Sequence, residues 1–194
     1  MTAKLDVRVE AEFEINGKKS SSMDPVRDML KKLVGKLDRA QMGDLLGEIG
    51  EIYYTSTMDR FRSHTDPKGR SWKWLQPKTI KLKTTGIVGK GGKTHRPPAV
   101  KSVSPRIGSS IQGGPYNQLI WTGKMVRAIR IVKDARRGSV NIGLSSTEIP
   151  YAWRHQMGYG KVPMRKFLGY NQATNAKAME AVARYVSQAI STGV

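Results

Sequence analysis

The sequence predicts an α+β protein, in which a small antiparallel sheet packs against amphipathic helices and is interrupted by a long irregular loop. The first observation is a strict alternation of apolar and charged residues from Lys4 to Ile15, which is typical of a strand with one buried face. The second is a helical spacing of apolar residues in three segments, 26–37, 45–61 and 176–190. The third is a pair of short strand patterns at 128–134 and 140–144, joined by a hairpin connection that contains glycine.

The N-terminal third is predicted to contain one strand and two helices. Asn16-Gly17 ends the strand in a turn, because both residue types favour turn conformations. Asp24-Pro25 suits the N-cap and the first position of the first helix. We expect Gly43-Asp44 to break that helix and to start the second one.

A reverse turn and two tryptophans follow the second helix. Asp66-Pro67-Lys68-Gly69 has the residues of a turn, since proline presets φ and glycine tolerates a positive φ. Trp72 and Trp74 stand two residues apart, so on a strand they would share one face. We expect them to cap the core, because large aromatic side chains are mostly buried. The alternative is stacking on a partner, with neighbouring cations in contact with bases or phosphates.

The segment 84–118 is rich in glycine and proline and contains no acidic residue. Such a composition does not build a core of its own, so the segment is predicted to be a long basic loop that is disordered in the free subunit. The remaining chain, 1–83 and 119–194, is predicted to form a single α+β domain. The cations of this basic loop are Lys90, Lys93, Arg96, Lys101 and Arg106.

The segment 149–169 concentrates aromatic residues between two prolines. Pro150 suits the first turn of a short helix over 151–157, which Gly158 would end in a left-handed cap. Gly160 allows a second sharp turn, and 161–168 reads as an extended arm. Large aromatic residues beside one arginine and one histidine are typical of packing or of an interface. The candidate interface residues are Tyr151, Trp153, His155, Arg165, Phe167 and Leu168.

The net charge of +19 predicts an acidic partner, either nucleic acid or acidic protein. The charge is distributed unevenly along the chain. Residues 60–137 hold 19 basic and 2 acidic side chains, whereas residues 1–59 hold 9 basic and 11 acidic ones. A solvated basic face would explain an ordinary excess of cations, but the complete lack of acids between Asp66 and Asp134 favours a functional electrostatic field.

The sequence gives no indication of catalytic or cofactor chemistry. The chain has no cysteine, which excludes disulfides and thiolate zinc sites. The stretch from Gly86 to Thr94 imitates a phosphate-binding P-loop, but its first glycine is misplaced and two prolines follow where a helix should begin. The three histidines lack ligand-like spacing, and no nucleophile elbow or carboxylate pair is present. We expect no enzyme, metal or cofactor, and neither a secretory signal nor a membrane span.

Four blocks of sequence together resemble the virion-morphogenesis and tail-completion family of Mu-like and other tailed phages. YAWRHQMG, which begins at Tyr151, and VPMRKFLG, which begins at Val162, resemble the family signature YA-x-x-HQ-x-G … IPARPFLG. WTGKMVRAI, which begins at Trp121, resembles TG-x-L-x-x-SI, and Arg60-Phe61 followed by PKGRSWKWL resembles RF … P-x-G-x-x-W-x-x-L. The blocks keep the family's order, although Lys166 replaces a proline and the segment 84–118 lies outside them.

The resemblance implies a structural protein of the virion, assembled in the host cytoplasm, that completes the tail or joins head and tail. It implies a homo-oligomeric ring, most simply a hexamer, that contacts connector, neck, tail-tube or tail-terminator proteins. We expect the segment 150–169 to form a contact between subunits, and the basic loop to meet acidic protein or DNA. The charge alone supports an alternative, a basic nucleic-acid-binding module, although no recognised nucleic-acid-binding motif is present.

Overall fold

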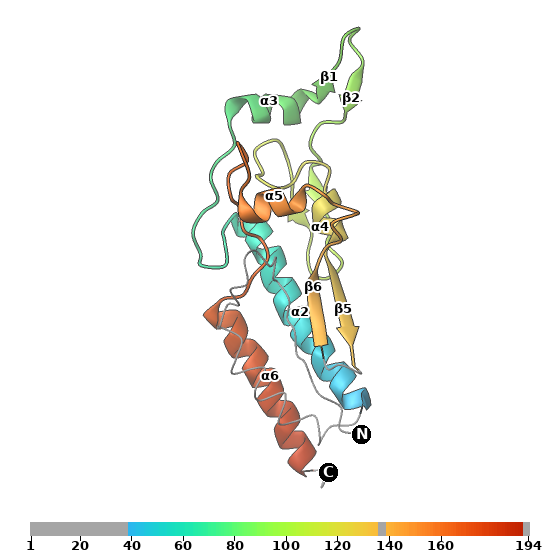
Figure 1. Cartoon of the computed structure of the whole chain (residues 1–194), viewed down its shortest axis with the longest axis vertical. Helices are drawn as coiled ribbons and strands as arrows, with labels where there is room; N and C mark the ends of the chain where they lie inside the picture. Colours follow the sequence, from blue (N-terminus) through green and yellow to red (C-terminus); the bar gives the residue numbers. More distant parts are fainter. Residues whose placement is uncertain (1–38, 136–138, 192–194) are drawn as a thin grey trace. The chain divides into compact units, whose positions relative to one another are not determined.

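The computed structural model describes residues 39–135 and 139–191, which belong to two compact units (Figure 1). Unit 1 holds the described parts of 1–56, 130–143 and 169–194, and unit 2 holds 57–129 and 144–168. Helices and two-stranded antiparallel sheets confirm the predicted α+β class. The predicted boundary at 84–118 does not coincide with these units, because that segment falls inside unit 2. The strand predicted for 4–15 and the helix predicted for 26–37 lie outside the described residues.

Unit 1 combines the N-terminal part of one long helix with a hairpin and the last helix of the chain. The elements are α2 (Arg39–Ser63), β5 (Arg130–Asp134), β6 (Ser139–Gly143) and α6 (Gln172–Ser191). β5 and β6 pair antiparallel in an unbroken register from Arg130↔Gly143 to Asp134↔Ser139, which confirms the predicted pair of strands.

The predicted helix break at Gly43-Asp44 is wrong, because both residues lie inside α2. A glycine within a helix costs about 1 kcal/mol relative to alanine. Met42, Leu45 and Leu46 are buried around this position, and their burial stabilises the helix by more than the glycine destabilises it.

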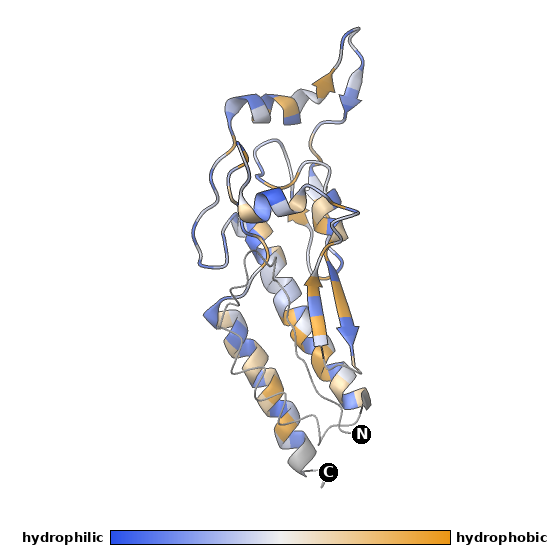
Figure 2. Ribbon diagram, viewed as in Figure 1, coloured by the Kyte–Doolittle hydropathy of each residue, from blue (hydrophilic) through white to orange (hydrophobic). Residues whose placement is uncertain are grey.

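Polar contacts fix α6 against α2 in an antiparallel arrangement. The Tyr53 hydroxyl donates to Oδ1 of Asn175 over 2.9 Å, and Arg184 forms an ion pair with Glu48. Figure 2 shows hydrophobic and hydrophilic residues alternating along α6, as expected of an amphipathic helix. The predicted stripe is only partly right, because Ala176 and Ala183 are exposed. The buried residues of α6 are Thr174, Ala178, Ala181 and Val182.

Gly50 allows α2 to approach the β5–β6 hairpin closely, and Figure 1 shows the two side by side. A Cβ atom at this position would lie 2.6 Å from Cγ2 of Ile131 and 3.0 Å from Cγ2 of Val140. Gly43, in the same helix, has no described atom within 4 Å of such a Cβ. Alanine substitutions at the two glycines can therefore be compared: both change helix propensity, but only the one at Gly50 also changes packing against the hairpin.

We expect Gly43→Ala to raise the free energy of unfolding by about 0.5–1 kcal/mol, because alanine is the better helix former. Gly50→Ala improves helix propensity by the same amount, but the overpacked methyl group lowers the free energy of unfolding by about 1–3 kcal/mol. The expected result for Gly50→Ala is a net loss of stability, measured by urea denaturation of both variants. Equal stabilisation by the two substitutions would contradict the close approach of helix and hairpin.

Unit 2 contains the end of α2, three shorter helices and two short ladders. The helices are α3 (Pro77–Thr85), α4 (Lys124–Ala128) and α5 (Ala152–Met157). The ladders pair β1 (Ile87–Val88) with β2 (Thr94–Arg96), and β3 (Ser102–Val103) with β4 (Ile111–Gln112). Within the described residues of both units, no helix is long and apolar enough to cross a membrane.

The segment 84–118 contains both of these ladders, with irregular backbone between them. Val103 and Ile111 pair across the second ladder and are each 1% exposed, so the segment contributes apolar groups to unit 2. All five cations of the basic loop are exposed. The predicted disorder of this segment in the free subunit stays a prediction.

The predicted turn at 66–69 is confirmed, and the expected core position of the two tryptophans is right for Trp72 and wrong for Trp74. The Gly69 amide donates to the Asp66 carbonyl over 2.9 Å, and φ of Gly69 is 78°. Residues 72–76 form no strand. Trp72 is therefore free to enter the core at 5% exposure while Trp74 is 57% exposed.

Candidate functional site: a cationic cleft in unit 2

The blocks that carry the family resemblance contact one another inside unit 2. Nη1 of Arg60 donates to the Phe167 carbonyl over 3.0 Å, and Nε1 of Trp72 donates to the Lys166 carbonyl over 3.0 Å. The Phe61 ring lies between two others, 5.8 Å from the Trp72 ring and 5.5 Å from the Phe167 ring. These contacts fix the arm 161–168 to the end of α2.

Gln156 on α5 holds the same arm through its amide group. Its Oε1 accepts from the backbone amides of Phe167 and Leu168, both at 3.1 Å. Its Nε2 donates to the Leu168 carbonyl over 2.9 Å. Gln156 is only 4% exposed, so these three hydrogen bonds satisfy backbone groups that have lost water.

Gly123, which precedes α4, adopts a left-handed conformation with φ of 74°. A Cβ atom there would lie 2.6 Å from Cγ2 of Val103 and 2.7 Å from Nη1 of Arg127. Both the backbone angle and the lack of space require glycine at this position. The Thr-Gly pair of the resemblance therefore has a structural role in unit 2.

The short helix predicted for 151–157 is confirmed as α5, and the predicted turn at Gly160 is confirmed by a φ of 58°. The predicted left-handed cap is wrong, because Gly158 combines a positive φ of 73° with a ψ of 127°. The interface candidates divide by exposure. Tyr151 is 41% exposed, and Trp153 and His155 are half-buried. Arg165, Phe167 and Leu168 are buried within unit 2, and the predicted contact between subunits is not tested by this placement.

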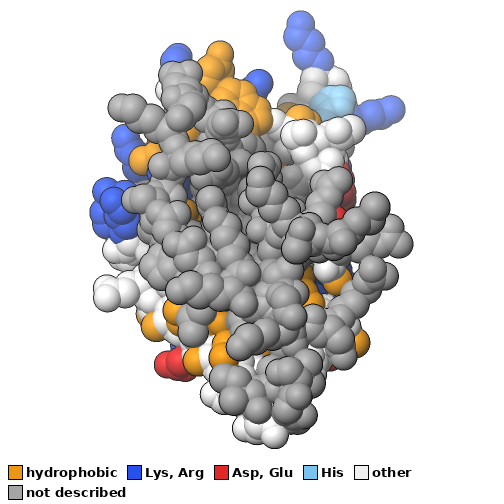
Figure 3. All heavy atoms as spheres, turned by 60° about the horizontal axis from the view of Figure 1, so that its bottom comes forward, with side chains coloured by type: hydrophobic (Ala, Val, Ile, Leu, Met, Phe, Trp, Pro, Cys, Tyr) orange, Lys and Arg blue, Asp and Glu red, His pale blue; other side chains and the backbone are white. Residues whose placement is uncertain are grey.

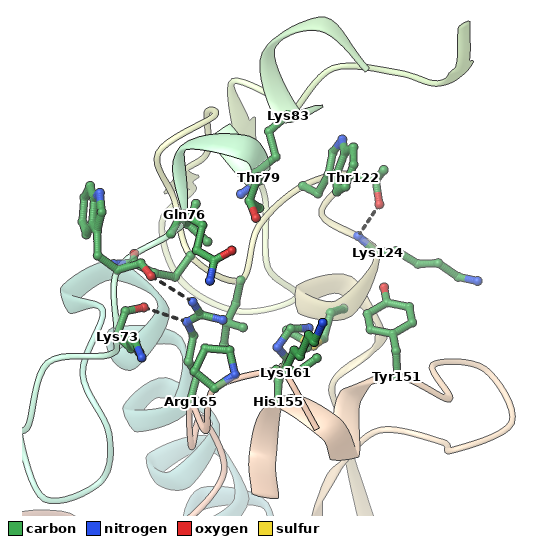
Figure 4. A pocket seen from close by; sticks show the side chains of 18 of the residues that line it. Lys73, Gln76, Thr79, Lys83, Thr122, Lys124, Tyr151, His155, Lys161 and Arg165 are labelled. Carbon is green, nitrogen blue, oxygen red and sulfur yellow. Dashed lines mark hydrogen bonds between the residues drawn. The ribbon is translucent and has the colours of Figure 1, made fainter. Parts of the chain in front are cut away.

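A cleft of about 850 Å³ opens in unit 2 beside the arm, and Figure 4 shows its lining side chains. Its walls come from the chain after Trp72, from α3, from the turn before α4, and from α5 with the arm. These elements lie far apart in the sequence, and the fold brings their polar and aromatic side chains together. The lining cations are Lys73, Lys83, Arg96, Lys124, Lys161 and Arg165.

No aspartate or glutamate is among the described residues that line the cleft. Two of the cations, Lys83 and Arg165, are buried at 2% and 5% exposure. Lys83 donates to the Asn117 carbonyl, and Arg165 donates through Nε to the Lys73 carbonyl over 3.0 Å. Burial, followed by the positive charge of Arg165, lowers the pKa of Lys83 to about 8.

Two further polar groups of the cleft have an unsatisfied atom. Nδ1 of His155 and Oε1 of Gln118 are buried without a hydrogen-bond partner. Burial, followed by the charge of Arg165, lowers the pKa of His155 from its ordinary value of 6.5 to about 4. His155 is therefore neutral at neutral pH, and Oε1 of Gln118 is an acceptor without a donor among the described residues.

We expect acid to destabilise the protein partly through His155. Its pKa in the folded state lies below that of the unfolded chain, so the unfolded state binds a proton first as the pH falls. The stability that neutral His155 contributes is fully present above about pH 6.5 and is lost as the pH falls to about 4. Urea denaturation across this range should show a weaker pH dependence for His155→Gln than for the wild type.

His95 provides the control for this experiment, because it is exposed and lies outside the cleft. The His95→Gln variant should follow the wild-type profile. Identical profiles for the wild type and His155→Gln would contradict the burial of a neutral imidazole.

Of the basic loop, the structure places only Arg96 in the cleft, where its guanidinium lies 5.9 Å from the Trp121 ring centroid. Sequence reasoning missed Lys73, Lys83, Lys124 and Gln118 as members of one site. The signal that could have pointed to them is the lack of acids between Asp66 and Asp134. Among the described residues, no group of three histidine or carboxylate side chains could hold a metal ion.

Comparison of the chain with family models, with curated proteins and with solved structures found no match.

Proposed function

We propose that the chain is a structural protein of a tailed-phage virion, a ring-forming subunit that completes the tail or joins head and tail. The observation that carries the proposal is the contact network between the blocks of the resemblance. Arg60, Trp72 and Gln156 come from three stretches of sequence, and all three bind the backbone of 166–168. Residues that recur together in a family because they define its fold are expected to contact one another in this way.

The proposed mechanism is docking. A cleft that is lined by cations and aromatic rings, and by no carboxylate among its described residues, suits binding of an anionic surface better than acid–base catalysis. The proposal therefore assigns the protein no enzymatic step and no cofactor.

Deletion of the gene in a phage that carries it tests the proposal. The expected result is a lysate with separate full heads and tails in electron micrographs, with infectivity restored by supplying the wild-type chain. Mass spectrometry of purified particles should detect the chain, and native mass spectrometry should show a closed ring, most simply a hexamer. Infectious particles without the chain, or an isolated monomer or twofold dimer in the virion, would contradict the proposal.

A nucleic-acid-binding module is the second candidate, and the exposed cations of the β1–β2 hairpin favour it. Lys90 and Lys93, in the connection between β1 and β2, are exposed, and so is Arg96 at the end of β2. In Figure 3, lysine and arginine side chains also project from described parts of the surface. Binding to duplex DNA should then weaken steeply with salt, with a slope of about −0.9 per neutralised phosphate. Tight duplex binding at physiological salt would favour this second candidate.

A further inference from the structure

We propose that the cleft of unit 2 binds an acidic, extended segment of a partner protein, with a carboxylate held by the cations of the cleft. The inference rests on the proposed docking function and specifies the chemistry of the partner. Every residue that carries the argument belongs to unit 2.

The positive charge inside the cleft is not compensated by any carboxylate among the described lining residues. Lys83 and Arg165 are both buried, and the positive charge of Arg165 acts on Lys83. Their described hydrogen-bond acceptors are backbone carbonyls, which carry no net charge. Buried charges in proteins are normally paired, because desolvation of an unpaired ion is costly. An anion supplied by a ligand would complete this arrangement.

An unsatisfied oxygen in the cleft indicates the kind of anion that would bind there. Gln118 is 6% exposed, and its Oε1 is an acceptor without a donor. A peptide offers one backbone N–H per residue, whereas the sugar-phosphate backbone of DNA offers none. A side-chain carboxylate can also enter a cleft and reach Arg165, whereas a duplex presents its phosphates on a broad convex surface. An acidic peptide therefore satisfies both the cations and the orphaned oxygen.

The lining of the cleft combines aromatic rings with cations. Trp74 and Tyr151 line the cleft and are 57% and 41% exposed. Exposed aromatic rings beside cations provide apolar contact area for a peptide while the charges set its register. Lys124 and Lys161 line the same cleft and are exposed, and Figure 4 labels both among its lining side chains. Such exposed cations increase the rate of encounter with an acidic segment.

The experiment compares two double variants of the full-length protein that have the same net charge. Lys124→Glu with Lys161→Glu reverses two exposed cations of the cleft, whereas Lys68→Glu with Lys81→Glu reverses two exposed cations outside it. The probes are a fluorescent hexaglutamate peptide, a hexaglutamine peptide and a single-stranded oligothymidylate with the same number of charges as hexaglutamate. Binding is measured by fluorescence anisotropy at two salt concentrations.

We expect the wild type to bind hexaglutamate in preference to both other probes. The cleft variant should lose about tenfold or more in affinity, because truncating or reversing charges at a docked carboxylate costs more than changing the distant field. The variant with substitutions outside the cleft should lose no more than about threefold, the size expected for a screened long-range charge.

An NMR titration provides a second readout that a general electrostatic field would not reproduce. Saturating hexaglutamate should raise the pKa of His155 and of Lys83, because a bound negative charge favours their protonated forms. The other charged or titratable groups of the cleft are Lys73, Arg96, Lys124, Tyr151, Lys161 and Arg165, and none of them is acidic.

Three outcomes would overturn the inference. Tighter binding of oligothymidylate than of hexaglutamate, lost in the same cleft variant, would assign the cleft to nucleic acid. Equal losses of hexaglutamate affinity in both double variants would show that the peptide responds to the overall positive charge of the protein and not to the cleft. Absence of hexaglutamate binding would remove the peptide site altogether. The virion role is tested separately by gene deletion, so either proposal can fail while the other stands.

Discussion

Phe167→Ala is expected to lower the free energy of unfolding by about 3–5 kcal/mol, the range for truncation of a buried phenylalanine. Phe167 is fully buried in unit 2, and its ring packs 5.5 Å from the Phe61 ring. The substitution leaves a cavity beneath the arm 161–168. The cavity lies among the residues that hold this arm to the end of α2. Urea denaturation followed by tryptophan fluorescence measures the loss.

Tyr116→Ala is the matched control, because Tyr116 lies in the same unit and is 61% exposed. Its effect should stay within about 0.5 kcal/mol, as is usual for surface positions. A Phe167→Ala protein that keeps its stability but fails to assemble would show that the Phe167 side chain belongs to an interface between subunits rather than to the core. The predicted contact between subunits is better tested with Tyr151 and Trp153, which reach the surface.

Gln156→Leu is expected to cost about 3–5 kcal/mol. The substitution keeps a side chain of similar size but removes every hydrogen bond of the amide. The backbone amides of Phe167 and Leu168 and the Leu168 carbonyl then lose their partner inside the unit. A buried polar group without a partner costs about 1–3 kcal/mol, so three such groups account for the expected loss. Denaturation of Gln112→Leu, which changes an exposed glutamine, is the control.

Gln156→Glu provides a sharper version of the same test. A protonated carboxyl group can still donate to the Leu168 carbonyl, whereas a carboxylate would face that carbonyl without a proton. Burial and the Leu168 carbonyl raise the pKa of the introduced acid, whereas the two backbone amides that bind Oε1 lower it. Because position 156 is only 4% exposed, we expect burial to dominate, so the hydrogen bond to the Leu168 carbonyl is present at low pH and is lost as the pH rises through the raised pKa. A variant whose stability relative to the wild type is the same at acidic and neutral pH would contradict the geometry around Gln156.

The local structure was predictable wherever a few adjacent residues determine the backbone. The turn at 66–69 and the end of α5 follow from proline and glycine, whose conformational preferences act locally. The break at Gly43-Asp44 was predicted wrongly because tertiary packing around α2 overrides helix propensity. The burial of Trp72 and the exposure of Trp74 were also not predicted, because the spacing of two aromatic residues indicates a shared face only if a strand forms.

The cleft was much less predictable than these elements. The lack of acids after Asp66 indicated an electrostatic role for this part of the chain. It did not indicate that Lys83 of α3 and Arg165 of the arm are buried in one cleft, because the two residues are far apart in the sequence. A reading of the hydrophobic pattern alone places such cations on the solvated surface. Their burial becomes apparent only in the folded structure.

The division of each unit into separate stretches of chain has a consequence for biosynthesis. Unit 1 is assembled from three stretches, and its last helix begins only at Gln172. A ribosome releases α2 long before α6, so Glu48 and Tyr53 of α2 emerge without their partners Arg184 and Asn175. Leu45 and Ile49 of α2 are fully buried in the finished protein. An apolar face of α2 must therefore avoid aggregation until α6 has been made. Folding of this unit is expected to wait for the synthesis of residues 172–191.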